Sequence, residues 1–188
     1  AFRLEIKTIN SVEAILLGSG RPMRLSELKN ILENSGLLIE LSDIKRSINE
    51  LEERYQDTSL EITEVASGFR LQIKDDHSPS LNLLWNEKTP RISKALMETI
   101  SIIAYKQPVT RGDIEDIRGI TVSTRSIRSL LERNWIKVSG YRDIPGRPAL
   151  YVTTKEFLND LNLKNISDLP KLPEIEEAEE KDILSQAV

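Results

Sequence analysis

Residues 46–54 read RSINELEER and residues 125–133 read RSIRSLLER, so the chain of 188 residues contains the pattern R-S-I-x-x-L-x-E-R twice. In each copy the apolar positions recur every three or four residues, which is the spacing of one buried helix face. A match of nine residues can arise by chance, so the segments around the two copies decide its meaning.

The order of elements before the two copies is the same. A proline, Pro22 or Pro108, precedes one amphipathic segment, and another amphipathic segment lies before each proline. Each copy of the pattern is therefore the third predicted helix of a set. Residues with capping chemistry mark the predicted helix boundaries: Thr110 with Asp113 as a capping box, Gly119 at a helix end, Ser42 before the first copy, and Ser123 or Thr124 before the second.

After each copy the apolar period changes from the helical value to two, which is typical of strands. In the first half, apolar residues alternate with polar ones on both sides of a turn at residues 66–68. In the second half, they alternate on both sides of residues 139–148. Three helices followed by a β-hairpin form a winged helix. We therefore predict an α+β, mainly helical fold of two tandem winged-helix domains, each with three helices and one hairpin.

The segment SGYRDIPGRP, residues 139–148, is the predicted tip of the second wing. A strand follows it where a phosphate-binding loop would continue into a helix, so a nucleotide site is excluded. Pro145 and Gly146 fit the centre of a type II turn, and Pro148 is expected to hold Arg147 in an extended conformation. The tip is therefore predicted to be stiff and to present Arg142 and Arg147.

The predicted organisation has four parts. Residues 1–76 form the first domain, 77–91 a linker without sustained periodicity, 92–170 the second domain, and 171–188 an acidic tail that we expect to be flexible.

The composition argues against an enzyme. The chain has no cysteine, which excludes disulfides, thiolate nucleophiles and zinc ribbons, and its single histidine, His77, lies in a predicted solvated turn. Acidic pairs such as Glu52 and Glu53 are adjacent in sequence and point in different directions on a helix. We predict no catalytic, cofactor or metal site, and no apolar run is long enough to span a bilayer.

The charges of the two third helices differ. Residues 43–55 carry a net charge of −1, which disfavours DNA, whereas the second copy contains Arg125 and Arg128. Arg125, Arg128 and Arg142 are the candidate DNA contacts, and a winged-helix DNA-binding transcriptional regulator is the alternative function. Two winged helices without a clear basic groove favour a protein–protein module.

Three segments carry a resemblance to a known family: ALMETISIIAYKQPVTRGDIEDIRGI (95–120), LLERNWIKVSGYRDIPGRPALYVTTKEFL (130–158) and DLPKLPEI (168–175). Together they closely resemble segregation and condensation protein B of bacteria. The likeness covers roughly residues 5–175 and is weaker in the first half.

The resemblance implies a non-catalytic, cofactor-free subunit of a condensin-like complex, located in the cytoplasm on the nucleoid. Such a subunit forms a homodimer through its first domain and binds the central region of the kleisin subunit ScpA, which bridges the heads of the SMC ATPase. The assembly serves chromosome condensation and segregation in cell division, with weak or indirect DNA contact. On this basis the expected kleisin-binding residues lie in the second domain: Ile102, Tyr105, Arg118, Arg147 and Tyr151.

Overall fold

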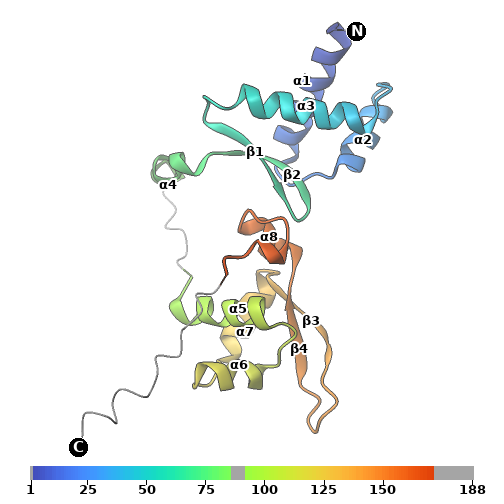
Figure 1. Cartoon of the computed structure of the whole chain (residues 1–188). Coiled ribbons are helices and arrows are strands. Elements are labelled where there is room, and N and C mark those ends of the chain that lie inside the picture. The colour runs from blue at the N-terminus through green and yellow to red at the C-terminus, as the bar shows by residue number, and fades with distance from the viewer. Residues whose placement is uncertain (1, 86–91, 172–188) are drawn as a thin grey trace, which may run out of the picture.

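The computed structural model describes residues 2–85 and 92–171 (Figure 1). Three helices and an antiparallel hairpin occur twice in the chain, which confirms the predicted pair of winged helices. The first set consists of α1 (Phe2–Ser19), α2 (Leu25–Asn34), α3 (Leu41–Arg54), β1 (Leu60–Val65) and β2 (Gly68–Ile73). The second consists of α5 (Lys94–Lys106), α6 (Arg111–Arg118), α7 (Thr124–Glu132), β3 (Ile136–Tyr141) and β4 (Ala149–Thr153).

Each winged helix has its own apolar core. The isoleucine and the leucine of the shared pattern lie in the core of each domain: Ile48 and Leu51 in α3, Ile127 and Leu130 in α7. Burial of these side chains stabilises each set by roughly 1.5–3 kcal/mol per residue. The repeat therefore reflects the same packing role in two places.

Most predicted helix boundaries are confirmed. The Thr110 hydroxyl accepts a hydrogen bond from the Asp113 amide (3.2 Å), and the Asp113 carboxylate accepts one from the Thr110 amide (2.8 Å), which completes the capping box of α6. Gly119 ends this helix in the left-handed conformation, with φ of 69°. Ser123 caps α7.

The predicted start of α3 was wrong. Glu40 is its N-cap, with its amide donating to the Asp43 carboxylate (3.1 Å), and Ser42 lies inside the first turn. The Asp43 side chain, at the third helical position, reaches back to Glu40, so the helix begins two residues earlier than Ser42 suggested.

The first wing lies close to the segment that connects α1 and α2. Phe69 and Met23 exchange two backbone hydrogen bonds of 2.8 Å, so this segment extends the hairpin by one bridge. Gly68 has φ of 132°, and a Cβ at this position would lie 2.2 Å from the Met23 carbonyl oxygen. Only glycine fits this approach.

The second wing contains the predicted type II turn. The Arg147 amide donates to the Ile144 carbonyl oxygen (2.8 Å), and Gly146 has φ of 86°, as the third residue of such a turn requires. The extended conformation expected for Arg147 was wrong, because its φ is 38°. A second hydrogen bond joins the two ends of the loop, because the Arg142 amide donates to the Pro148 carbonyl oxygen (3.0 Å).

The segment between the two winged helices is more regular than its sequence predicted. A short 3-10 helix, Asp75–His77, leads into α4 (Ser78–Trp85), so His77 lies in a 3-10 turn and remains exposed. Pro79 is tolerated because the first turn of a helix needs no amide donor there. The rest of the linker, residues 86–91, and the acidic tail beyond Lys171 lie outside the described residues.

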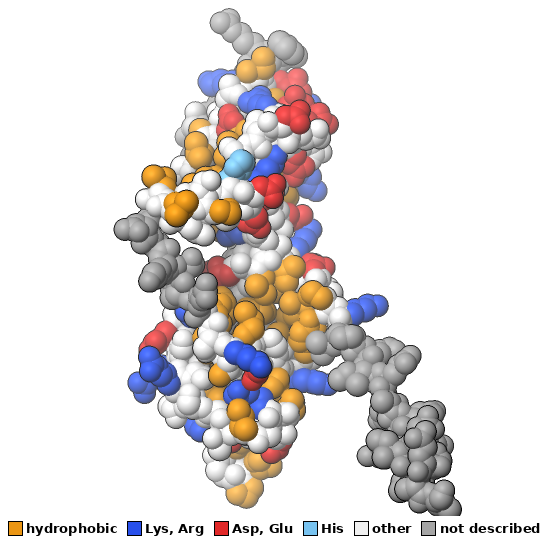
Figure 2. Space-filling view, turned by 90° about the vertical axis from the view of Figure 1, so that its left-hand side faces the viewer, with side chains coloured by type: hydrophobic (Ala, Val, Ile, Leu, Met, Phe, Trp, Pro, Cys, Tyr) orange, Lys and Arg blue, Asp and Glu red, His pale blue; other side chains and the backbone are white. Residues whose placement is uncertain are grey.

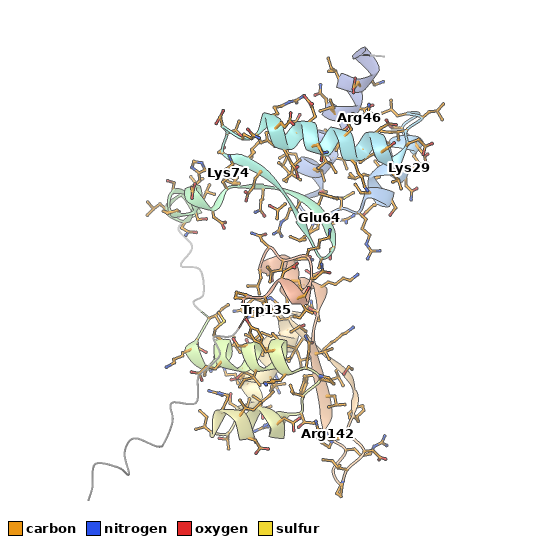
Figure 3. All side chains as sticks on the ribbon, in the orientation of Figure 1. Lys29, Arg46, Glu64, Lys74, Trp135 and Arg142 are labelled. Atoms are coloured by element: carbon orange, nitrogen blue, oxygen red, sulfur yellow. The ribbon has the colours of Figure 1, made fainter. Side chains whose placement is uncertain are left out.

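An additional helix, α8 (Lys155–Asp160), follows the second hairpin and precedes a 3-10 turn, Ile166–Asp168. Figure 1 shows α8 between the tip of the first hairpin and the second set of helices. The Trp135 indole, labelled in Figure 3, donates to the Asp160 carboxylate (2.7 Å) and packs edge-on against Phe157. These contacts attach α8 to the second core.

On its other side α8 contacts the first wing. The Asn159 side chain, 3% exposed, accepts from the Ser67 amide (3.1 Å) and donates to the Ser67 hydroxyl (2.9 Å). The Ala66 amide donates to the Leu163 carbonyl oxygen (3.0 Å). The tip of the first wing is thus covered within the chain.

Candidate partner-binding surfaces

A groove lies along the outer face of α5 beside the end of α6. Its α5 residues recur three or four positions apart and so form one stripe of the helix surface. The groove is lined by Lys94, Met97, Glu98, Ser101, Ile102 and Arg118. Two of the five residues that we expected to bind the kleisin, Ile102 and Arg118, therefore lie together here. Figure 2 views the side on which α5 begins and shows hydrophobic side chains gathered on the second domain between charged ones.

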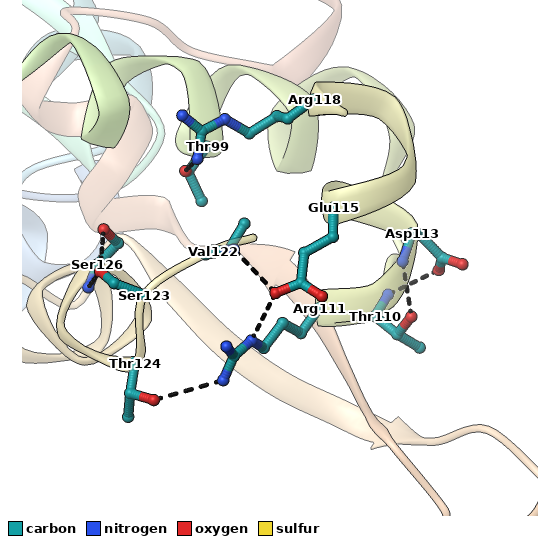
Figure 4. A network of polar contacts seen from close by, with 10 residues as sticks. All are labelled: Thr99, Thr110, Arg111, Asp113, Glu115, Arg118, Val122, Ser123, Thr124 and Ser126. Carbon is teal, nitrogen blue, oxygen red and sulfur yellow. Dashed lines mark hydrogen bonds and ion pairs between the residues drawn. The ribbon is translucent and has the colours of Figure 1, made fainter. Parts of the chain in front are cut away.

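Arg118 is nearly buried, with 7% of its side chain exposed. Its Nη2 donates to the Glu98 carboxylate (2.9 Å) and its Nη1 to the Thr99 hydroxyl (3.5 Å), while its Nε has no hydrogen-bond partner among the described residues. Figure 4 shows this side chain reaching from α6 toward Thr99. Glu98 also lies 3.9 Å from the Lys94 ammonium group. The rim of the groove thus carries alternating charges.

The remaining three expected kleisin residues do not line this groove. The Tyr105 hydroxyl, at the end of α5, donates to the Pro170 carbonyl oxygen (2.5 Å). Tyr151 is half-buried against the second core, and its backbone exchanges hydrogen bonds with Val109. Arg147 is exposed at the tip of the second wing. The structure therefore separates the five residues into a groove pair and three residues elsewhere.

The three candidate DNA contacts also separate. Arg125 and Arg128 lie on the exposed side of α7, in a shallow hollow that they share with Thr124, Ser129 and Glu132. Arg142 instead places Nη1 and Nη2 at 2.8 and 2.7 Å from the two carboxylate oxygens of Asp113. This pairing and the bond from the Thr110 amide lower the pKa of Asp113 to about 2. Arg142 therefore ties the second wing to α6, and Arg147 is left as the arginine that the wing tip presents.

The loop before α7 is held by a second polar network, drawn in Figure 4. The Glu115 carboxylate accepts from the Val122 amide (2.8 Å) and from Arg111 (3.0 Å). Arg111 also donates to the Thr124 hydroxyl (3.4 Å). The bond from Val122, with that from Arg111, lowers the pKa of Glu115. The start of α7 is fixed by these contacts.

The repeated arginines have different surroundings in the two halves. In α3, Arg46 pairs with Glu5 (3.3 Å) and Asp43 (3.5 Å). Arg54, at the end of that helix, lies 3.6 Å from Glu13. Its counterpart in the second half, Arg133, stacks over the Trp135 ring at 5.6 Å. Arg46 is therefore paired within its own domain.

A pocket of about 260 Å³ lies between α1 and α3 in the first domain, and sequence reasoning missed it. Leu38, which is fully exposed, stands at this pocket together with Ile39 and Ile9. The signal was the apolar run LLI, residues 37–39, between two helices. Leu38 beside this pocket is therefore a candidate contact residue, and the neighbouring Ile39 and Ile9 are buried.

Within residues 2–85 and 92–171, no three His, Asp or Glu side chains are grouped as metal ligands. In that same part of the chain, no helix has the length and apolarity to cross a membrane.

Comparisons with known proteins agree with the resemblance seen in the sequence. Residues 10–172 match the family model of the segregation and condensation complex subunit ScpB. The segregation and condensation protein B homolog of Coxiella burnetii is 45% identical over 153 residues, which cover 81% of this chain and 73% of the relative. The protein of that name from Clostridium tetani is 36% identical over 163 residues, covering 85% and 83%.

A crystal structure of a dimer of the ScpB N-terminal domain complexed with an ScpA peptide is 26% identical and covers 44% of this chain and 92% of that one, with a TM-score of 0.36. The assignment rests on the sequence matches, which extend over most of both partners in each pair. The chain belongs to the family of the segregation and condensation complex subunit ScpB, a non-catalytic subunit of the SMC complex.

Proposed function

We propose that the chain is a homodimeric adaptor that binds the kleisin subunit ScpA and, through it, the SMC ATPase on the chromosome in the cytoplasm. Residues 1–76 form the dimer in this proposal, and residues 92–170 bind the central region of the kleisin. Family membership supports the proposal. The similar N-terminal domain dimer complexed with an ScpA peptide supports the choice of ScpA as partner and of the first domain for the dimer, and it is no support for placing the kleisin site in residues 92–170.

The observation that carries the kleisin site is the groove of α5. Met97, 46% exposed, and the half-buried Ile102 supply apolar anchors, and charged groups surround them. An apolar centre with a polar rim is the usual anatomy of a protein interface. A helix or an extended segment of the kleisin fits such a groove. Tyr105, Tyr151 and Arg147 would meet parts of the kleisin outside the groove.

For the dimer we propose the surface around the pocket of α1 and α3. Leu38 cannot bury its side chain within its own protomer, and burying it in a partner contributes roughly 1.5–3 kcal/mol. Ile6, on α1, is also partly exposed in this domain.

The test mixes the full chain with its cognate kleisin subunit and follows the complex by size-exclusion chromatography with light scattering. The wild-type proteins should co-elute. In titration calorimetry, the affinity of Met97→Glu for the kleisin should be at least tenfold lower than that of wild type, because the substitution places a charge in the apolar part of the groove. Leu83→Glu is the matched control, since Leu83 is 83% exposed on another helix, and it should bind within about twofold of wild type.

The two parts of the proposal fail in different ways. If the folded wild-type chain and its folded kleisin do not co-elute, the adaptor function is wrong. If they co-elute and Met97→Glu binds as tightly as the control, the partner lies on another surface.

A further inference from the structure

We propose that the exposed face of α7 contacts phosphates of duplex DNA without sequence preference, giving the adaptor a direct hold on the chromosome. The two arginines that make this contact are Arg125 and Arg128. The proposed kleisin groove of α5 does not include this face of α7, so the contact with DNA can be tested separately from kleisin binding. Arg147 in the second wing is named for both partners.

Arg125 and Arg128 are exposed, and neither guanidinium forms a hydrogen bond or an ion pair with another described residue. They stand three positions apart on one helix and are therefore neighbours on its surface. Thr124 and Ser129 place hydroxyl groups in the same hollow. Arginine and hydroxyl side chains are the usual protein donors to DNA phosphates.

The equivalent helix of the first domain, α3, has its arginines paired with acidic residues. Arg46, which occupies the place of Arg125 in the repeat, is neutralised by Glu5 and Asp43. The cation at the end of that helix, Arg54, faces Glu13. The charges of α3 without a described ion-pair partner are one lysine and three glutamates: Lys45, Glu50, Glu52 and Glu53. That helix would repel DNA.

In this fold the wings flank the third helix and contact the DNA backbone. The first wing tip is occupied by α8, through Ser67 and Asn159. The second wing tip is held in a closed turn and exposes Arg147. Lys137, at the start of β3, is also exposed, with no described ion-pair partner. In the second winged helix, both the third helix and the wing tip are therefore exposed and basic. In the first winged helix, neither of them is.

The same surface limits the strength of the contact. Glu132 lines the hollow of α7, and Asp143 is exposed in the second wing. The whole chain carries a formal net charge of −4. Few phosphates are neutralised, so binding should be weak and sensitive to salt. For two phosphates the affinity should fall about tenfold between 50 and 200 mM NaCl, because each neutralised phosphate contributes a slope of about −0.9 to the double-logarithmic salt plot.

The experiment measures fluorescence anisotropy of a labelled 30-base-pair duplex, at several salt concentrations, as the full chain is added. Arg125→Glu/Arg128→Glu should weaken binding at least tenfold at 50 mM NaCl. The matched control is Lys45→Glu in α3, compared with Arg128→Glu in α7, because each substitution changes the net charge of the chain by the same amount; Lys45→Glu should stay within about twofold of wild type. A second duplex of unrelated sequence should bind equally well.

Circular dichroism melting and co-elution with the kleisin are recorded for every variant. Retained folding and kleisin binding in Arg125→Glu/Arg128→Glu, together with lost DNA binding, support the proposal. Arg125→Ala/Arg128→Ala is the milder substitution and should show the same direction of change in a chain that melts like wild type. The proposal is overturned if the wild type does not bind the duplex at 50 mM NaCl, or if the α3 control loses as much affinity. Loss of kleisin binding without loss of DNA binding would assign the face to the kleisin instead and also overturn it.

Discussion

Arg142 in the second wing donates hydrogen bonds to both carboxylate oxygens of Asp113. The amide and the carboxylate of Asp113 also complete the capping box of α6. One carboxylate thus caps a helix and anchors a hairpin. Bidentate arginine–carboxylate pairs are among the stronger ion pairs because two parallel hydrogen bonds fix their geometry. This contact links the second wing to α6.

Asp113→Asn should change how stability depends on acid. The folded state lowers the pKa of Asp113 from its ordinary value of 3.8 to about 2, so its stabilising effect is complete above about pH 4 and is lost as the pH falls toward 2. Urea unfolding between pH 2 and 5 should show a shallower decline in the free energy of unfolding for Asp113→Asn than for wild type. Asp143→Asn, an exposed carboxylate in the same wing, is the control and should follow wild type. Equal slopes for all three proteins would contradict the assignment.

Asn159→Ala should loosen the contact between the first wing and α8. The substitution removes both hydrogen bonds with Ser67 and leaves the neighbouring bond from the Ala66 amide to Leu163 less protected. Hydrogen exchange of the Ala66 amide, followed by NMR, should become at least about tenfold faster, since local opening sets the rate. Asn82→Ala, on the exposed side of α4, is the control. Unchanged exchange in Asn159→Ala would show that this contact does not hold the two domains together.

Gly68→Ala should be strongly destabilising. The methyl group would lie 2.2 Å from the Met23 carbonyl oxygen, and the φ of 132° is unfavourable for alanine. We expect a loss of at least about 2 kcal/mol in the free energy of unfolding, measured with urea. Gly140→Ala is the matched control, because no heavy atom lies within 4 Å of its Cβ position. A Gly68→Ala protein as stable as the control would rule out the close approach of the hairpin to Met23.

Leu38→Asp should convert the proposed dimer into a monomer. A charged side chain at this position would have to be desolvated in the interface, which costs several kcal/mol for an unpaired charge. Light scattering at increasing protein concentration should give the mass of one chain for Leu38→Asp and of two chains for wild type. Leu84→Asp, at another exposed leucine, is the control and should remain dimeric. A dimeric Leu38→Asp protein would place the interface elsewhere.

Much of the fold was predictable because its signals are local. The capping box of Thr110 and Asp113, the helix end at Gly119 and the turn at Pro145 and Gly146 involve residues within a few positions of one another. The N-cap at Glu40 was missed because Glu40 forms a capping box with Asp43, three positions later, whereas Ser42 is the residue type that usually caps a helix. Helix α4 was missed because its eight residues are too few for a clear apolar period.

The candidate surfaces were less predictable. Arg118 and Arg142 both looked like exposed cations in the sequence, yet one is nearly buried beside Glu98 and the other is bound to Asp113. Arg125 and Arg128 remained without described partners. No local pattern distinguishes these outcomes, because the partner of each arginine comes from a different helix or from solvent.

By itself the amino-acid sequence determined the two winged helices, since apolar periods, caps and turn residues act over a few positions and occur twice in the same order. The tertiary structure alone decided which charges remain free and which wing tip remains open. Ser67 and Asn159 are 92 positions apart, and Asp113 and Arg142 are 29 apart. Contacts at such separations depend on how helices and hairpins pack against one another. Patterns of a few neighbouring residues do not specify that packing.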